Sequence, residues 1–443
     1  MRKPVYGLTG IMVAALIYYV AAGSTQIADE IKKQVVTELA VLKKNGFDIE
    51  NRTAKDNTEH LIIHFSDPEK IAHYLSAQGL RVDAENAKIF QGMKAGIDIH
   101  YLPDAANALS LEIYPLNLPP SITSVASQEE DQKALQAAQN LIDKKVFLLH
   151  IDFEKLLSGF KGYVKDIHIT PESNQQIELV MRGMIFEGNI EKEQIKTIAQ
   201  KLEFFSLRAA DDFQIQLSNV KSTYMLTGPS LYDISTKYEI GQMQFDEKSG
   251  VSLHLDHFNT DSASWTKEDL LSNRMATKIE TITIDANNKK AKLEGVVYEA
   301  NVSNLNIPAL EKLSQTSTNE QNETIILFGQ MLSNNAALDI SALRVAKIET
   351  DAKTMDGFTA NARLSFNKNI DFQAWQTNPL TLLETINVQT NISLSSELFM
   401  YFMEDPRAMI IPMLFPPKEE NGKKIYDIRL HKGMLKINDV PLQ

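Results

Sequence analysis

Most of the chain alternates between apolar and polar residues with a period of two. Clear examples are residues 109–113, 213–217, 251–255 and 362–366. Such alternation places apolar side chains on one face of a strand and polar side chains on the other, which is typical of antiparallel sheets. The pattern predicts an α+β fold that is predominantly antiparallel β. We expect a large twisted or curved sheet or an open barrel, with a long N-terminal helix and a few short helices.

Helical periodicity interrupts this pattern at a few places. A helix is predicted at 68–77, where Asp67 and Pro68 form a conventional helix start. Further helices are predicted at 128–144, 308–313 and 319–332, whereas residues 190–208 fit a helix or a strand. The best candidates for a boundary between subdomains are residues 118–127 and 259–264.

The longest predicted helix runs from Val5 to Asn45 and ends before Gly46. Its second half carries apolar residues at spacings of four, four, four and three, which form one helix face. This face either packs on the chain's own sheet or forms a self-association face of a homodimer. Its residues are Ile27, Ile31, Val35, Leu39 and Leu42.

The first half of that helix is predicted to be a membrane anchor. Residues 5–22 contain no charge and follow Arg2 and Lys3, a pattern typical of a transmembrane signal anchor. Val20-Ala21-Ala22 also fits a signal-peptide cleavage site, so cleavage stays an alternative. The positive charges favour a cytoplasmic segment 1–4, a helical stalk 23–46 and a β-rich region 47–443 in the periplasm of a Gram-negative bacterium.

Composition narrows the classes of function. The net charge is −12, which disfavours a nucleic-acid partner because such proteins need a basic surface. The chain has no cysteine, which excludes disulfides, thiolate zinc sites and thiol nucleophiles and agrees with an oxidising compartment.

Candidate polar chemistry is sparse, and we predict no catalytic, cofactor or metal site. His60 and His64 are too far apart along one strand to share a metal ion. His254 and Asp256 share a strand face without a further evident ligand. The carboxylate pairs Asp211-Asp212 and Glu419-Glu420 are interpreted as turn residues.

Residues 398–417 are unusually rich in methionine and other apolar residues. Four prolines in this stretch exclude one long helix or a central strand. The segment either caps the sheet as ordinary core or forms an adaptable surface that binds a lipid or a partner. The residues of this predicted Met-rich surface are Phe399, Met400, Met403, Met409, Ile411, Met413 and Phe415.

Three features together resemble the YdgA-like family of bacterial envelope proteins, whose molecular function is unassigned. They are the basic start with its anchor, the segment 252–366 with its strand-to-helix step at 305–310, and the closing hairpin at 429–442. The resemblance implies an inner-membrane-anchored periplasmic protein and transfers no catalytic residues.

The resulting hypothesis is a non-catalytic envelope protein that binds a lipid, an acyl chain or an envelope partner. One alternative is a scaffold that dimerises through the stalk. Another is a periplasmic hydrolase whose site no motif reveals.

Overall fold

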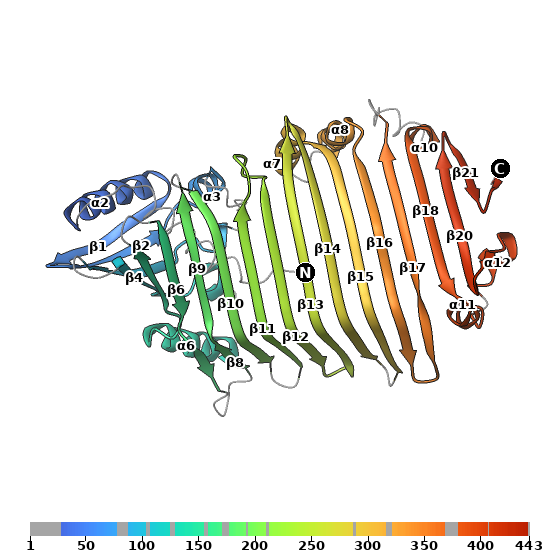
Figure 1. Cartoon of the computed structure of the whole chain (residues 1–443). Helices are drawn as coiled ribbons and strands as arrows, with labels where there is room; N and C mark the ends of the chain where they lie inside the picture. The colour runs from blue at the N-terminus through green and yellow to red at the C-terminus, as the bar shows by residue number, and fades with distance from the viewer. Residues whose placement is uncertain are drawn as a thin grey trace. The chain divides into compact units, whose positions relative to one another are not determined.

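The computed structural model describes residues 28–77, 87–102, 107–124, 129–154, 158–170, 177–191, 194–209, 212–286, 289–315, 321–367, 380–405 and 407–441. The chain forms two compact units, unit 1 (Met1–Ala210) and unit 2 (Asp211–Gln443). Both units consist mainly of antiparallel strands with short helices, so the predicted predominance of antiparallel sheet is confirmed (Figure 1). Residues 259–264 belong to a strand that pairs with a neighbour on each side.

The described residues of unit 1 form ten strands, and most of these strands pair with their neighbours in sequence. The pairing order is β1-β2-β3-β4-β5-β6-β9-β10, and β10 also pairs with β8, which pairs with β7. The strands are β1 (Phe47–Lys55), β2 (Thr58–Phe65), β3 (Lys94–Tyr101), β4 (Asn107–Pro115), β5 (Leu149–Glu154), β6 (Gly159–Val164), β7 (Ile167–Ile169), β8 (Ile177–Arg182), β9 (Met184–Glu191) and β10 (Gln194–Ala209). The ambiguous residues 190–208 are therefore strand, because pairing with β9 and β8 outweighs their helical spacing.

Four helices are described in unit 1: α2 (Ala28–Lys44), α3 (Pro68–Ala77), α5 (Pro120–Thr123) and α6 (Glu129–Asp143). Helices α3 and α6 agree closely with the predicted ranges. Helix α2 ends one residue before the predicted stop at Asn45. The predicted continuous helix from Val5 is seen only over α2, since residues 1–27 lie outside the described residues.

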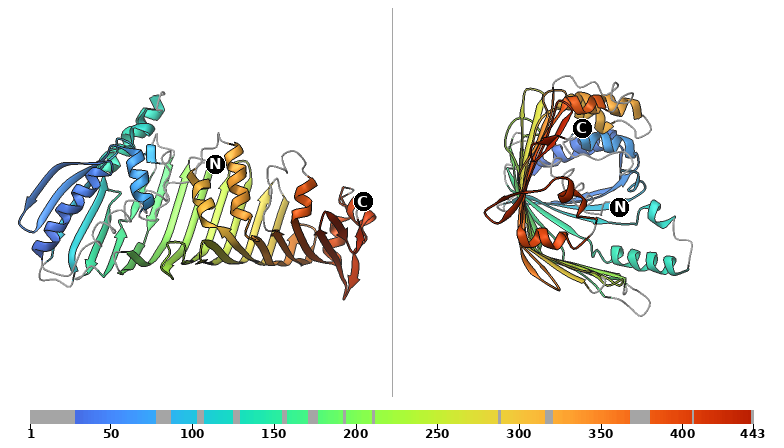
Figure 2. Two further views of the ribbon diagram at one scale, coloured as in Figure 1. Left: turned by 90° about the horizontal axis from the view of Figure 1, so that it is seen from above. Right: turned by 90° about the vertical axis from the view of Figure 1, so that its right-hand side faces the viewer.

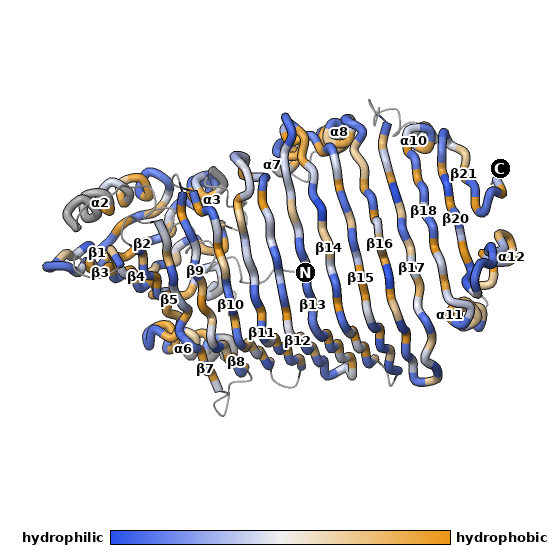
Figure 3. Tube along the Cα trace, in the orientation of Figure 1, coloured by the Kyte–Doolittle hydropathy of each residue, from blue (hydrophilic) through white to orange (hydrophobic). Residues whose placement is uncertain are grey.

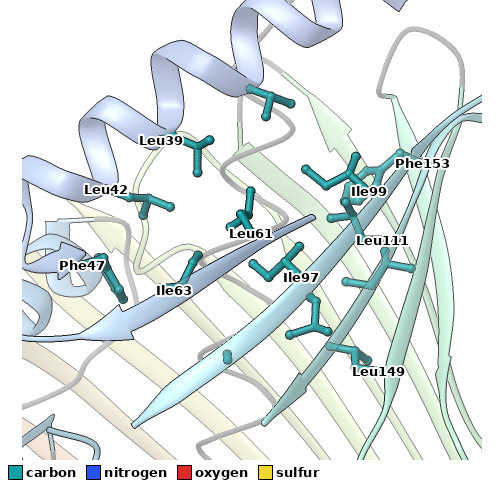
Figure 4. Close-up of a cluster of buried hydrophobic side chains, with 14 of the residues drawn as sticks. Leu39, Leu42, Phe47, Leu61, Ile63, Ile97, Ile99, Leu111, Leu149 and Phe153 are labelled. Atoms are coloured by element: carbon teal, nitrogen blue, oxygen red, sulfur yellow. The ribbon is translucent and has the colours of Figure 1, made fainter. Parts of the chain in front are cut away.

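The core of unit 1 lies between α2, α3 and one face of the sheet. Leu39 and Leu42 of α2 point onto Leu61, Ile97 and neighbouring side chains of the central strands (Figure 4). These sheet residues are almost completely buried, with 1% exposure for Leu61 and 2% for Ile97. Burying each such side chain contributes roughly 1.5–3 kcal/mol. Unit 1 therefore has a closed, two-layer core.

Unit 2 is built around longer strands. The pairing order is β11-β12-β13-β14-β15-β16-β17-β18-β20, and β19 and β21 also pair with β20, while β22 pairs with β21. The strands are β11 (Phe213–Leu226), β12 (Ile234–Glu247), β13 (Val251–Lys267), β14 (Leu270–Ala286), β15 (Lys289–Asn306), β16 (Ala337–Thr350), β17 (Thr354–Phe366), β18 (Ile386–Ser395), β19 (Lys418–Glu420), β20 (Lys423–His431), β21 (Met434–Ile437) and β22 (Val440–Pro441).

The described helices of unit 2 occupy connections between its strands. They are α7 (Ile307–Gln315), α8 (Gln321–Leu332), α10 (Leu380–Thr385), α11 (Ser396–Phe402) and α12 (Ile410–Leu414). Helices α7, α8 and α10 lie on one side of the unit 2 sheet, beside the ends of its strands (Figure 2). A small cluster around Ala309, Met331 and Leu332 joins α7 and α8 to Leu305 and Phe366 at the strand ends. The middle of the strands is thus not covered by these helices.

A line of unpaired ladder positions, here called the crease, crosses unit 2 from β11 to β17. At this line one residue on each strand is left out of the pairing, while the antiparallel register is the same on both sides. Alternate strands have a left-handed residue there, namely Asn219 (φ 53°), His257 (φ 50°) and Gly295 (φ 62°). The complete line is Asn219, Gly241, His257, Glu280, Gly295, Ala346 and Gly357.

The crease reverses the alternation of side chains along each strand. In β11 the apolar positions change from 213, 215 and 217 to 220, 224 and 226, and β13 changes in the same way between Leu255 and Phe258. A shift of one residue exchanges the two faces of a strand. The additional residue that each strand has at the crease therefore keeps the apolar side chains before and after the crease on the same face. Residues i and i+3 around the crease therefore share a face.

The core of unit 1 predicts that substitutions at two nearby residues of α2 have very different effects on the free energy of unfolding. Leu39→Ala should lower the free energy of unfolding by about 2–5 kcal/mol, because Leu39 is 6% exposed and its removal leaves a cavity. Val36 is 47% exposed, so Val36→Ala should change the free energy of unfolding by no more than about 0.5 kcal/mol. Denaturant unfolding of the full chain measures both. Equal effects would show that α2 does not pack as described.

The crease predicts a second pair of unlike effects. An alanine Cβ at Gly295 would lie 2.9 Å from the Cβ of Ala346, whereas one at Gly250 (φ 85°) has nothing within 4 Å. In both variants the left-handed backbone conformation of the alanine costs about 1–2 kcal/mol of stability. Gly295→Ala should be the more destabilising by at least about 1 kcal/mol, because it also overpacks the crease. Denaturant unfolding compares the two variants, and a smaller loss for Gly295→Ala would contradict the close approach.

Candidate functional site: an uncovered apolar track in unit 2

Two continuous rows of apolar side chains cross unit 2, one on each side of the crease. Both rows run perpendicular to the strands, and their members are cross-strand neighbours. We call them together the apolar track. The first row is Leu217, Met243, Leu255, Ile282, Leu293, Ile348 and Met355. The second row is Val220, Ile240, Phe258, Ile279, Val296, Val345, Phe358 and Leu394.

The opposite face of the same strands is polar and carries ion pairs. Lys237 lies 2.7 Å from Glu239, and His254 lies 3.0 Å from Asp256. A hydrogen bond from Lys237 holds the pKa of Glu239 below its usual value. The polar side chains of this face suit it to contact with water. In Figure 3 the strands of unit 2 alternate between hydrophobic and hydrophilic colour along their length.

The apolar track is only partly covered. All of its residues on β11–β15 are half-buried rather than buried, although they sit in the middle of long strands. The equivalent face of unit 1 has exposures of 0–2% at Leu61, Ile99 and Ile151, where helices cover it. The difference shows that, among the described residues, no element closes over this part of the track.

Helix α11 closes the track at one end. Ser395 caps this helix by accepting a hydrogen bond from the backbone N–H of Leu398. Leu398 is 1% exposed, and the two buried track residues, Val345 and Met355, are at 6% and 2%. Because α11 contacts β17, β18 and β20, it forms the closed end of an otherwise open apolar surface.

The Met-rich surface predicted from the sequence extends from α11 to Phe415. Met400, Met409, Ile411 and Met413 are exposed, with 75% exposure for Met413. Phe399, Met403 and Phe415 are half-buried. The interpretation of this segment as ordinary core therefore applies to Leu398 of α11, whereas α12 presents its apolar side chains to solvent.

The predicted self-association face has a different place in the structure. Val35, Leu39 and Leu42 are buried in the core of unit 1 at 3–6% exposure. They pack on the chain's own sheet and are not available to a second copy. Ile27 and the side chain of Ile31 lie outside what the structure describes. Of the two alternatives that the sequence left open, packing on the chain's own sheet is the one that the structure shows at these three positions.

Three polar side chains of unit 1 converge on Asp98. One carboxylate oxygen lies 2.6 Å from His60 Nδ1, and the other accepts from Tyr114 (2.9 Å) and Lys145 (3.2 Å). Partial burial alone would raise the pKa of Asp98, but these three hydrogen bonds outweigh it and hold the pKa below its usual value. Asp98 is thus kept ionised as the centre of a polar sheet face.

The remaining titratable candidates stay separate. His60 and His64 engage different carboxylates, and His254 pairs with Asp256 alone. Within the residues that the structure describes, no group of three histidines and carboxylates is placed to hold a metal ion. Glu419 and Glu420 are exposed in β19, while Asp211 lies outside the described residues.

None of the helices in the described part of the chain combines the length and apolar character needed to cross a bilayer. The predicted anchor at 5–22 lies outside those residues. Comparison of the chain with protein-family models, curated proteins and solved structures gives no match.

The apolar track was missed from the sequence, although a signal for it exists. Each of the seven strands β11–β17 carries apolar residues at i and i+3 with two small or polar residues between them. Taken one strand at a time, this spacing only weakens the alternation. Repeated in successive strands, it indicates a crease flanked by two apolar rows.

The exposure of the Met-rich surface predicts that it contributes little to stability. Changing Met409, Ile411 and Met413 together to serine should alter the free energy of unfolding by no more than about 1.5 kcal/mol, since exposed substitutions usually cost within 0.5 kcal/mol each. Denaturant unfolding of the full chain is the measurement. A loss of more than about 5 kcal/mol, as expected for three buried side chains, would make this segment core.

Proposed function

We propose that this protein binds the acyl chains of lipids on the apolar track of unit 2. The observation that carries the proposal is the open part of the track on β11–β15, where apolar side chains in the middle of a sheet are only half-buried. Each Å² of apolar surface removed from water contributes roughly 25 cal/mol. A flexible hydrocarbon chain gains this contribution along its whole length without leaving polar groups unpaired.

The chemistry of the track favours hydrocarbon over an extended peptide. A peptide strand laid on this face would bring backbone N–H and C=O groups against aliphatic side chains, and each unpaired group costs free energy. An acyl chain has no such groups. The methionines and the mixed aliphatic and aromatic side chains of the track accommodate chains of different length and saturation.

The same proposal places the protein in the bacterial envelope. Residues 5–22 supply the anchor in the inner membrane and the bulk of the chain lies in the periplasm, as the charge pattern and the likeness to the YdgA-like family imply. Binding without catalysis fits unit 1, where the cluster around Asp98 is a set of satisfied hydrogen bonds on an open sheet face.

A second candidate function is the docking of an envelope partner. The exposed apolar residues of α12 favour it, because exposed apolar patches commonly mark interaction sites. A scaffold that dimerises through its stalk has lost support, since Val35, Leu39 and Leu42 are buried in unit 1.

The proposal is tested by photo-crosslinking with the full chain reconstituted in vesicles of phosphatidylethanolamine and phosphatidylglycerol that carry radioactive phosphorus. A benzoylphenylalanine replaces Leu255, on the track, or the adjacent His254, on the polar face of the same strand. Illumination should label the protein through position 255 and leave position 254 at background. The two positions differ only in the face they occupy.

Equal labelling of both positions would show nonspecific contact with the vesicle. Absence of labelling at 255, with the fold confirmed by circular dichroism, would remove the acyl-chain proposal. In that case, labelling from a probe at Met413 would favour a lipid contact through α12 alone.

A further inference from the structure

A row of hydroxyl side chains runs beside the apolar track on β11–β15. Each member lies two residues from a track residue on the same strand and therefore shares its face. Successive members are also cross-strand partners. The row consists of Ser222, Tyr238, Thr260, Thr277 and Tyr298.

The row changes character at β16. Its continuation there and on β17 and β18 is Leu343, Ala360 and Ile392, which carry no hydroxyl. The hydroxyl row thus accompanies the open part of the track and stops where α11 approaches. Polarity along the track is directional, with oxygen-bearing side chains toward β11 and hydrocarbon toward β18.

The hydrogen bonds within the row leave acceptor positions at Thr260. The hydroxyl of Thr260 lies 2.8 Å from that of Thr277 and 3.2 Å from the carbonyl oxygen of Ala276. Tyr238 is 47% exposed, so its phenol reaches the solvent side of the face. A hydroxyl donates one hydrogen bond and accepts two. Thr260, which donates to Ala276, can therefore still accept a hydrogen bond from a glycerol hydroxyl, and the exposed phenol of Tyr238 can donate to an ester oxygen.

The dimensions agree with one acyl chain. Five strands at about 4.8 Å spacing give the open part of the track a length of about 19 Å. An acyl chain spans one leaflet, about half of the 30 Å hydrocarbon core of a bilayer. A chain laid across the strands therefore fits between β11 and the closed end under α11.

From these observations we propose that the track binds an ester-linked lipid in one direction. The glycerol and ester oxygens lie over Ser222, Tyr238 and Thr260, and the terminal methyl group lies toward α11. This inference rests on the proposed function and adds to it the class of lipid and its orientation.

The orientation is tested with two photoreactive phosphatidylglycerols in vesicles of phosphatidylethanolamine and phosphatidylglycerol that contain the full chain. One carries a diazirine at the end of an acyl chain, and the other carries it on the glycerol headgroup. Peptide mapping should find the chain-end probe on β16 and α11, and the headgroup probe on β11–β13. The reverse distribution, or one distribution for both probes, overturns the orientation.

The hydroxyl row is tested by affinity. Tyr238→Phe combined with Thr260→Val removes two hydroxyls with little change in volume, and should weaken binding of a fluorescent phosphatidylglycerol about ten-fold, as for two modest hydrogen bonds. Thr223→Val, on the exposed polar face of β11, is the matched control and should leave binding unchanged.

Unchanged affinity in the double variant overturns the role of the hydroxyl row even when wild-type protein binds lipid. If the wild-type chain binds no lipid, the proposed function itself is wrong. Unfolding curves of the three proteins exclude a general loss of structure as the cause.

Discussion

Antiparallel hydrogen bonding in fixed register is the constraint on which unit 2 depends. Each strand from β11 to β17 is held to its neighbours by a long ladder, so an additional residue in one strand must be matched in all of them. The crease is the result. Left-handed residues on alternate strands, among them Asn219 and His257, absorb the change in direction, and asparagine and histidine are among the side chains that tolerate this conformation best.

The two units solve the same problem of an apolar sheet face in different ways. Unit 1 covers its face with α2 and α3, and its central side chains are excluded from water. In unit 2 the apolar track on β11–β15 is only half-buried, and the unit relies on long ladders for its cohesion. A sheet that is stable without a complete second layer can accept a hydrocarbon ligand as a temporary layer, which is the physical basis of the proposed function.

Local patterns were sufficient to predict much of the fold. Period-two alternation predicted the strands, and capping residues such as Asp67 and Pro68 predicted α3. The Lys432-Gly433 turn was also predictable, and both residues have the positive φ that a tight hairpin requires. The end of helix α2 was located to within one residue, but spacing alone did not decide what its apolar face contacts.

The site was less predictable because it depends on register between strands far apart in sequence. Val220 and Phe358 belong to one row only after seven strands have been aligned. The Met-rich surface was found from composition, whereas the hydroxyl row was hidden because Thr260 and Thr277 appear in sequence as ordinary strand residues.

Strand β1 forms an edge of the unit 1 sheet, since β2 is its partner among the described residues. Its register shifts between Glu50 and Thr53, and Asn51 there has a positive φ of 48°. The outer part of this strand exposes Arg52 and Lys55, and an irregular, charged edge is a poor template for another strand. Unit 1 thereby protects this edge from edge-to-edge aggregation, which matters for a protein that consists mainly of sheet.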